Sequence, residues 1–132
     1  MEAHQIPIRP ELVVETDITP TRIQEEMTKL FDLPKPPTAI FALNDVVSLA
    51  IIDFCYARNI RIPDELSLVS FDYQTLVQRT TPEITSVVVP AYDFGQRAAE
   101  MLLQRQKSPN LTAQQISLDY RIEVRETTAA PK

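Results

Sequence analysis

The sequence predicts a single α/β domain with three α/β/α layers and a mostly parallel sheet. Two continuous apolar runs, residues 39–43 and 66–71, lack the alternation of a half-exposed strand. A strongly apolar segment of helical length separates them. Strand, helix and strand in succession form a βαβ unit, which is right-handed and parallel in nearly all cases. The carboxyl ends of both strands then lie on one edge of the sheet, where open α/β sheets bind ligands.

The first part of the chain predicts a strand and a helix. Residues 11–15 read E-L-V-V-E, a short strand. Thr19 followed by Pro20 is a helix start, with Thr19 as N-cap and proline at the first helical position. Apolar residues then recur at helical spacing to about residue 33, and Pro34 stops the helix.

The helix after Asn44 is apolar on every side, from Val46 to Ala57. Such a helix is buried on every side, so we expect one side to cover the sheet and the other to face a second subunit. With glycine nearly absent from the chain, Asn59 is the expected C-cap residue.

Three further elements are predicted in the last third of the chain. Residues 84–89 form a β-branched strand that Pro90 ends. A helix follows from 94 to about 106. Residues 115–125 alternate apolar and polar side chains, which is typical of a long strand with one wet face.

Composition limits the function classes. The 132 residues suffice for one domain. The net charge of -5 does not favour binding to the phosphate backbone of a nucleic acid. A single glycine, Gly95, excludes a glycine-rich phosphate loop or a dinucleotide fingerprint. One cysteine, Cys55, excludes an intrachain disulfide and is expected as a small buried hydrophobe. No run approaches the roughly 20 apolar residues of a membrane span, and residues 1–10 lack a signal pattern, so we expect a cytoplasmic protein.

Polar residues follow the predicted strands at their carboxyl ends: Asp17, Asn44, Asp45 and Asp72. On one rim, such side chains suit a hydroxyl-rich ligand, because they give and accept hydrogen bonds in fixed directions. A helix N-cap is the alternative for Asn44 and Asp45, and a turn residue for Asp72. The only histidine, His4, lies in the loose N-terminus, and no Cys/His cluster or catalytic motif occurs. We therefore expect no metal, no cofactor and no catalytic residues.

Four motifs occur in order: P-T-A-I-F-A-x-N-D, I-P-D-E-L-S-L-V-S-F-D, T-P-x-I-T-S-V-x-x-P-x-x-x-x-G-x-x-A-A-x-x-L-L and R-x-E-V-R-E-T-T. With them the chain resembles, from about residue 11 to 128, the lactose/galactose-repressor family of bacterial transcriptional regulators. Members have a helix-turn-helix DNA-binding domain and an effector-binding core. That core is similar to periplasmic sugar-binding proteins of type I, with two α/β lobes around a cleft.

The resemblance covers the second half of that core. It implies that residues 11–89 and 120–126 form the second lobe, and that 93–118 cross to a first lobe that is largely missing, like the DNA-binding domain. Without that lobe the apolar face of the 94–106 helix would lack a sheet partner. We therefore expect it to be covered by swapping or association, or to repack onto the second lobe.

The resemblance also implies a function and its residues. The chain would bind a sugar or related metabolite and act allosterically on DNA binding, with DNA contacted only through the absent domain. Effector contacts would fall on Asp72, Asn44 and Ile18, although many members place an aromatic residue where Ile18 stands. The family forms homodimers through this lobe. The expected interface residues are Ile23, Val46, Leu49, Ala50, Asp53, Leu76, Arg79 and Thr80.

Two other functions fit the same fold. An exported sugar-binding protein of an ABC transporter would have the same lobes but a signal peptide. A glycoside-processing enzyme would use a pair of carboxylates at a defined separation, which the sequence does not reveal.

Overall fold

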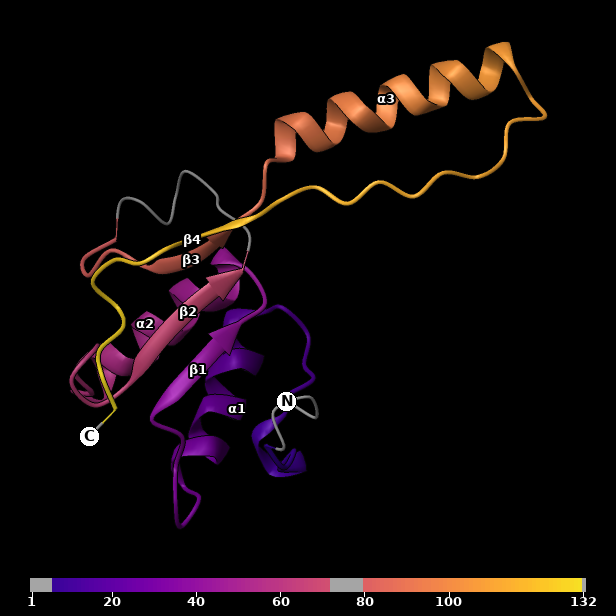
Figure 1. Ribbon diagram of the computed structural model, residues 1–132. Helices are drawn as coiled ribbons and strands as arrows, with labels where there is room; N and C mark the ends of the chain where they lie inside the picture. The colour runs from indigo at the N-terminus through magenta and orange to yellow at the C-terminus, as the bar shows by residue number, and fades with distance from the viewer. Residues whose placement is uncertain (1–5, 72–79, 132) are drawn as a thin grey trace.

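The computed structural model describes residues 6–71 and 80–131 of the chain (Figure 1). Their four strands form one sheet in the order β1-β2-β3-β4, with β1, β2 and β3 parallel and β4 antiparallel to β3. This confirms the mostly parallel sheet and the parallel βαβ unit. The strands are β1 Ala39–Ala42, β2 Ser67–Phe71, β3 Thr85–Val88 and β4 Arg121–Glu123; the helices are η2 Pro10–Leu12, α1 Pro20–Phe31, α2 Asp45–Ala57 and α3 Ala91–Lys107.

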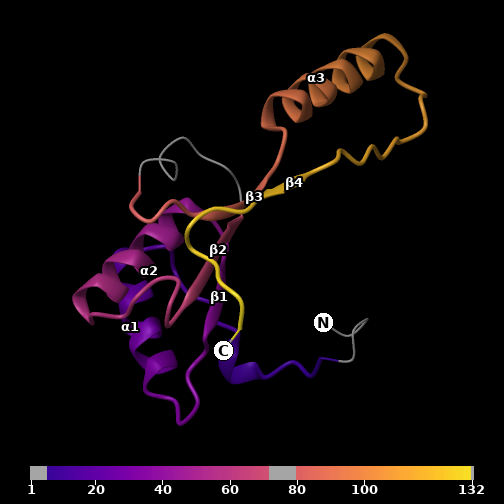
Figure 2. The same cartoon turned by 60° about the vertical axis from the view of Figure 1, so that its left-hand side comes forward.

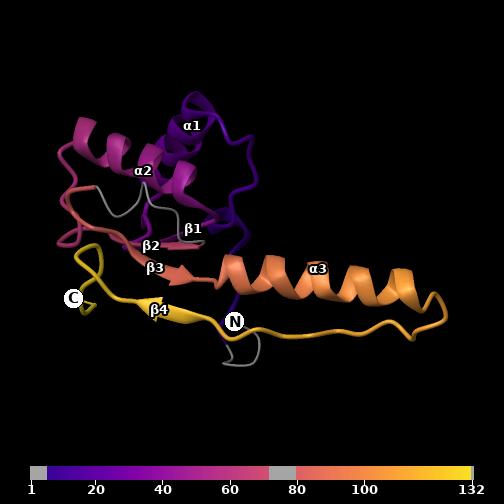
Figure 3. The same ribbon diagram turned by 90° about the horizontal axis from the view of Figure 1, so that it is seen from above.

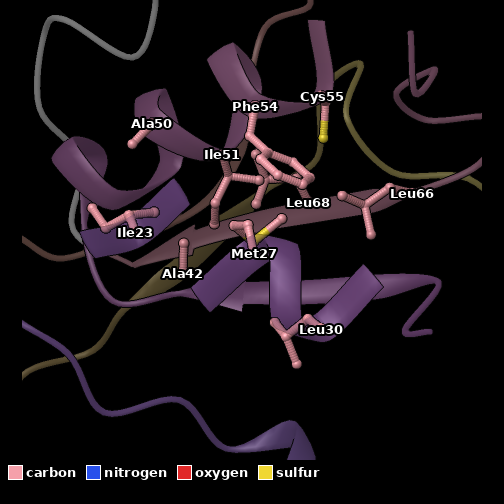
Figure 4. Packing of buried hydrophobic residues seen from close by; sticks show 10 residues of the cluster. All are labelled: Ile23, Met27, Leu30, Ala42, Ala50, Ile51, Phe54, Cys55, Leu66 and Leu68. Carbon is pink, nitrogen blue, oxygen red and sulfur yellow. The ribbon is translucent and has the colours of Figure 1, made fainter. Parts of the chain in front are cut away.

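Helices α1 and α2 lie side by side on one face of the sheet (Figure 2). Helix α1 begins as predicted, with Pro20 at its first position and the Thr19 hydroxyl accepting a hydrogen bond from the Arg22 N–H. Its stripe of Ile23 and Met27 enters the core, where Phe54 of α2 lies over β2 (Figure 4). Within the described residues, the opposite face of the sheet has no helix packed on it, so the third predicted layer is not supplied by this part of the chain.

Helix α2 ends, as predicted, at an asparagine that takes the place of the usual C-cap glycine. Asn59 adopts φ 56°, in the left-handed region that asparagine tolerates better than most residues. The Ile60 N–H then donates to the Cys55 carbonyl at 2.8 Å, and the Asn59 N–H donates to the Tyr56 carbonyl. These two bonds make a Schellman motif, which turns the chain toward β2.

The last residues of the chain clamp β2 to β3. Thr127 is fully buried; its hydroxyl donates to the Leu68 carbonyl at 2.6 Å and accepts from the Thr85 N–H at 2.8 Å. The Leu68 N–H donates in turn to the Thr127 carbonyl. Arg125 adds a bond from its guanidinium to the Ile84 carbonyl. The motif R-x-E-V-R-E-T-T thus has a structural role at the amino ends of these strands.

Two strand predictions are wrong: one strand does not form, and the other is much shorter than predicted. Residues 11–15 do not pair in the sheet: Pro10 opens the short helix η2, and residues 13–17 run on without a ladder. The long strand predicted at 115–125 shrinks to β4, because β3 offers only four residues and the chain before Arg121 passes beyond the sheet edge. Helix α3 begins at Ala91, three residues before the predicted start.

Helix α3 and the extended residues 111–118 form an arm that projects from the sheet (Figures 1 and 3). No residue of α3 is buried, and Phe94 and Leu102 are largely exposed. The expected repacking of this helix onto the second lobe is therefore wrong. Both ends of the arm leave the sheet at one point, because Val88 pairs with Arg121. None of the helices in the described part of the chain has the length and hydropathy to cross a bilayer.

Candidate functional site

The candidate site is the rim formed by the carboxyl ends of β1 and β2. The two strands run side by side in parallel, with Ala42 opposite Ser70, so both end on the same edge. Asn44 follows β1 by two residues, and Phe71 is the last residue of β2. The prediction that these two strand ends lie on one edge of the sheet is confirmed. Asp72 directly follows Phe71 in the sequence but lies outside the described residues.

Asn44 is the N-cap of α2. Its Oδ1 accepts a hydrogen bond from the Val47 N–H at 3.0 Å, and its backbone carbonyl accepts from the Ser48 hydroxyl and N–H. The cap uses only the side-chain oxygen, so it leaves the amide NH₂ uncommitted. Asn44 can therefore cap the helix and still donate hydrogen bonds to a ligand on the rim.

Asp45 has a structural role. It is 9% exposed, and its Oδ1 accepts a hydrogen bond from the Val46 N–H at 2.8 Å. A carboxylate in the first turn of a helix also stabilises the exposed N–H groups there. These contacts favour the helix-start interpretation of Asp45 over ligand binding.

Ile18 lies in the segment before α1, 46% exposed. It lines a groove that Leu43, at the end of β1, also lines, so this segment reaches the rim. Asp17 uses its backbone carbonyl to accept from the Thr19 N–H at 2.8 Å, which fixes the turn into α1. Ile18 gives this part of the site an apolar surface without an aromatic ring.

Sequence reasoning missed a pair of aromatic rings at the rim. Phe41 of β1 and Phe71 of β2 meet edge to face, with ring centroids 6.4 Å apart and 74° between the planes. Both remain exposed, at 63% and 39%. Their neighbours Ala42 and Ser70 are small and face the helices, and that alternation was the signal available in the sequence. Aromatic rings at a binding edge suit the apolar C–H faces of a sugar.

The predicted interface residues divide into two groups. Ile23 and Ala50 are 3% and 5% exposed and belong to the core, which leaves little of them for a second subunit. Val46, Leu49 and Asp53 share one face of α2 at helical spacing, and that face is not buried in the protomer. Tyr56, 87% exposed, continues the same face and was not predicted.

The remaining interface calls lie after β2. Thr80 is half-buried, and its hydroxyl donates to the Pro82 carbonyl at 2.8 Å. Leu76 and Arg79 lie outside the described residues.

We refer below to Val46, Leu49, Asp53 and Tyr56 as the outer face of α2.

Among the described residues, the titratable side chains offer neither a metal-binding cluster nor a reactive thiol. Across residues 6–71 and 80–131, no three His, Cys, Asp or Glu side chains are grouped so that they could hold a metal ion. Cys55 is buried in α2, as expected, and burial raises the pKa of its thiol to about 11. A thiol with so high a pKa stays protonated and is a poor nucleophile near neutral pH.

Comparison with known proteins identifies the family. The sequence matches the family described as "Periplasmic binding protein-like domain" over residues 1–128. The chain belongs to this family. It is 33% identical over 129 residues to the HTH-type transcriptional regulator DegA of Bacillus subtilis, covering 98% of this chain and 38% of DegA.

Solved structures of this periplasmic-binding-protein-like family agree with the fold. A transcriptional regulator LacI of Bacillus cereus subsp. cytotoxis superposes with a TM-score of 0.90 at 26% identity, over 97% of this chain and 45% of that one. A LacI family transcriptional regulator of Enterococcus faecium, with bound ribose, has a TM-score of 0.84 at 25% identity, over 99% of this chain and 48% of that one. The resemblance to the lactose/galactose-repressor family is confirmed.

The chain spans only 37 to 38% of the length of the curated relatives that it matches. Among them, CytR of Escherichia coli is an HTH-type transcriptional repressor and DegA an HTH-type transcriptional regulator.

Proposed function

We propose that this chain is the effector-binding and dimerisation portion of a LacI-type bacterial transcriptional regulator, without enzymatic activity of its own. The observation that supports this most is the parallel pairing of β1 and β2, which carries the Asn44 amide and two exposed phenylalanine rings to one rim. Open α/β sheets bind ligands at this edge. Since the Enterococcus relative was solved with ribose, the effector class that we propose is a sugar or a related metabolite.

Each group on the rim has a role in this proposal. The Asn44 NH₂ donates hydrogen bonds to ligand hydroxyls, while its oxygen holds the helix. The rings of Phe41 and Phe71 contact the apolar face of the ligand. Asp72 accepts hydrogen bonds from ligand hydroxyls, as the sequence motif implies, and Ile18 closes the side of the site that is next to α1.

The arm supports a two-lobe protein. Residues 11–89 and 120–126 would form the second lobe, and 93–118 would cross to a first lobe in a longer protein. The arm leaves and re-enters the sheet at the paired residues Val88 and Arg121, and its helix buries no side chain in the second lobe. The greater length of the relatives leaves room for a first lobe and a DNA-binding domain.

Regulation would follow from closure of the cleft between the lobes. A ligand that binds both lobes favours the closed arrangement, and the change in lobe angle alters DNA affinity at a distant domain. The net charge of -5 supports a division of labour in which this part does not itself hold DNA. The protein would act in the cytoplasm, where the chromosome is.

Homodimerisation would use the outer face of α2. Val46 is 46% and Tyr56 87% exposed, and Leu49 and Asp53 lie between them on the same helix face. Two copies of this face would bury apolar side chains that a monomer leaves in water, which favours association. The isologous geometry of a two-fold axis needs only this one surface.

A titration with sugars tests the effector site. Ribose and a panel of mono- and disaccharides are added to the labelled chain, and amide signals are followed by NMR. We expect Asn44 and Phe71 to shift for at least one sugar. Because one lobe supplies half a cleft, half-saturation should fall in the millimolar range, about -4 kcal/mol of binding free energy.

Matched substitutions make the test specific. Asn44→Ser keeps a capping oxygen but removes the amide donors, so the sugar affinity should fall about tenfold while the helix persists. Asn110→Ser makes the same chemical change in the exposed loop of the arm and should leave the affinity unchanged. Sugar-induced shifts confined to residues away from the rim, or equal affinities for the two variants, would contradict the proposal.

A further inference from the structure

The outer face of α2 has the residue spacing of a helix that packs against another helix. Its four residues are three, four and three positions apart along the chain. This is the alternation of the a and d positions of a heptad, which places all four residues along one seam of the helix. On the opposite side of α2, Ile51 and Phe54 point into the core and are 2% and 4% exposed (Figure 4).

Asp53 interrupts the apolar character of this seam. Its side chain is exposed, and within residues 6–71 and 80–131 its carboxylate forms no hydrogen bond or ion pair. The nearest cations along the chain are already engaged: the Arg58 guanidinium lies over the Phe54 ring at 5.1 Å, and Arg61 pairs with the Glu65 carboxylate. The seam therefore carries a negative charge that the described part of the protomer does not neutralise.

A two-fold axis would bring the two Asp53 side chains of a dimer close together. With a rise of about 1.5 Å per residue, the seam from Val46 to Tyr56 is about 15 Å long. If two antiparallel seams overlap fully, the axis passes beside Ile51, and the two Asp53 residues lie about 6 Å apart along the helices. If the seams are parallel, the two residues lie side by side. Charges this close repel each other even at physiological salt, where the Debye length is about 8 Å.

We propose that Asp53 is the specificity-determining residue of the homodimer, and that its carboxylate opposes the pairing of identical chains that the apolar residues around it favour. This inference rests on dimerisation through the outer face of α2, as proposed above. A polar residue in an apolar seam lowers the stability of the pair and selects its register. Asp53 thus keeps the dimer reversible, and a chain with a basic residue at this position would bind more tightly than a second copy does.

Removal of the charge tests the repulsion. Asp53→Asn keeps the size of the side chain, so the dissociation constant of the dimer, measured by sedimentation equilibrium, should fall at least about fivefold. Added salt should tighten the wild-type dimer more than the Asp53→Asn dimer. Asp32→Asn makes the same change at the exposed end of α1, away from the seam, and should leave the constant unchanged. A weaker dimer in Asp53→Asn would mean that the carboxylate meets a cation across the interface, and would overturn the proposal.

Charge reversal tests whether the two side chains approach each other. When Asp53→Lys is mixed with the wild-type chain, each heterodimer replaces a pair of like charges by a pair of opposite charges. In native mass spectrometry, heterodimers should outnumber all homodimers at least about threefold, whereas random pairing gives equal numbers. A mixture of Asp32→Lys with the wild-type chain should stay random. Random pairing of Asp53→Lys would refute the role of Asp53.

The dimer and the role of Asp53 can fail separately. If the wild-type chain and Asp53→Asn are both monomeric at every concentration, or if Leu49→Arg leaves the dimer intact, the interface on α2 is wrong and this inference is wrong with it. If Leu49→Arg dissociates the dimer but the Asp53 variants behave like the Asp32 controls, the interface stands and only the role of Asp53 is overturned.

Discussion

Replacing Thr127 by valine tests whether the end of the chain holds the sheet together. Valine has nearly the shape of threonine, so Thr127→Val opens no cavity and removes only the hydroxyl. That hydroxyl bridges two strands, donating to the Leu68 carbonyl and accepting from the Thr85 N–H. Leu68 and Thr85 are 0% and 3% exposed, so water cannot replace the lost partner.

The expected cost follows from the two groups left unpaired. A buried backbone group without its partner costs about 1–3 kcal/mol, so two such groups cost roughly 2–6 kcal/mol of the free energy of unfolding. We take about 3 kcal/mol. With a urea m-value of about 1.5 kcal/mol/M for a chain of this size, the unfolding midpoint should fall by roughly 2 M.

Urea unfolding followed by circular dichroism measures this shift, with Thr128→Val as the matched control. The Thr128 hydroxyl lies 3.0 Å from the Thr85 hydroxyl but is only half-buried, so its loss should cost about 1 kcal/mol or less. Thr127→Ser keeps the bridging hydroxyl and should recover most of the lost stability. A midpoint for Thr127→Val no lower than that of Thr128→Val would refute the clamp.

Three further predictions follow from single residues. Asn59→Ala should destabilise the chain by about 1 kcal/mol in the same urea assay, because alanine is strained at φ 56°, whereas Asn59→Gly should not. Leu49→Arg should convert a dimer to a monomer in light scattering by charging the outer face of α2, and Leu103→Arg on the arm should not; dimers that persist in Leu49→Arg would contradict the interface. Burial raises the pKa of the Cys55 thiol to about 11, so the folded chain keeps this proton at a pH where the unfolded chain has lost it. The free energy of unfolding should therefore fall as the pH rises from about 9 to 11. Cys55→Ala has no thiol to titrate and should remove the part of this fall that Cys55 causes.

The parts of the fold that local sequence signals determine were predictable. Thr19 with Pro20, and Asn44 before an apolar helix, begin α1 and α2 where the sequence indicates, because capping depends on residues close in the chain. The runs 39–43 and 66–71 became β1 and β2. Their parallel pairing followed from the length of the helix between them.

The errors concern strands whose formation depends on a distant partner. Alternation at 115–125 is real, but only residues 121–123 of it pair with β3. Residues 12–18 alternate as well, yet they pair with none of the four strands among the described residues. Periodicity indicates which side a residue faces, whereas a ladder also requires an edge of matching length.

The candidate site was predictable only in part, for a similar reason. Asn44 was predicted correctly because a residue that directly follows a parallel strand lies at the carboxyl edge of the sheet, whichever strands are its neighbours. Phe41 and Phe71 were missed because their runs indicated burial on both faces. Their exposure comes from the absence of a helix over that face in the described residues, which no local pattern encodes.

The clamp and the rim lie at opposite ends of the same strands, and this separates stability from binding. Thr127 joins β2 to β3 through Leu68 and Thr85, near their amino ends, while the rim and both ends of the arm lie at the carboxyl ends. A movement of the arm would therefore act on Val88 and Arg121, next to the rim, and would leave the clamp in place. It follows that Thr127→Val should lower the unfolding midpoint without changing the sugar affinity, whereas Asn44→Ser should lower the sugar affinity and leave the midpoint nearly unchanged.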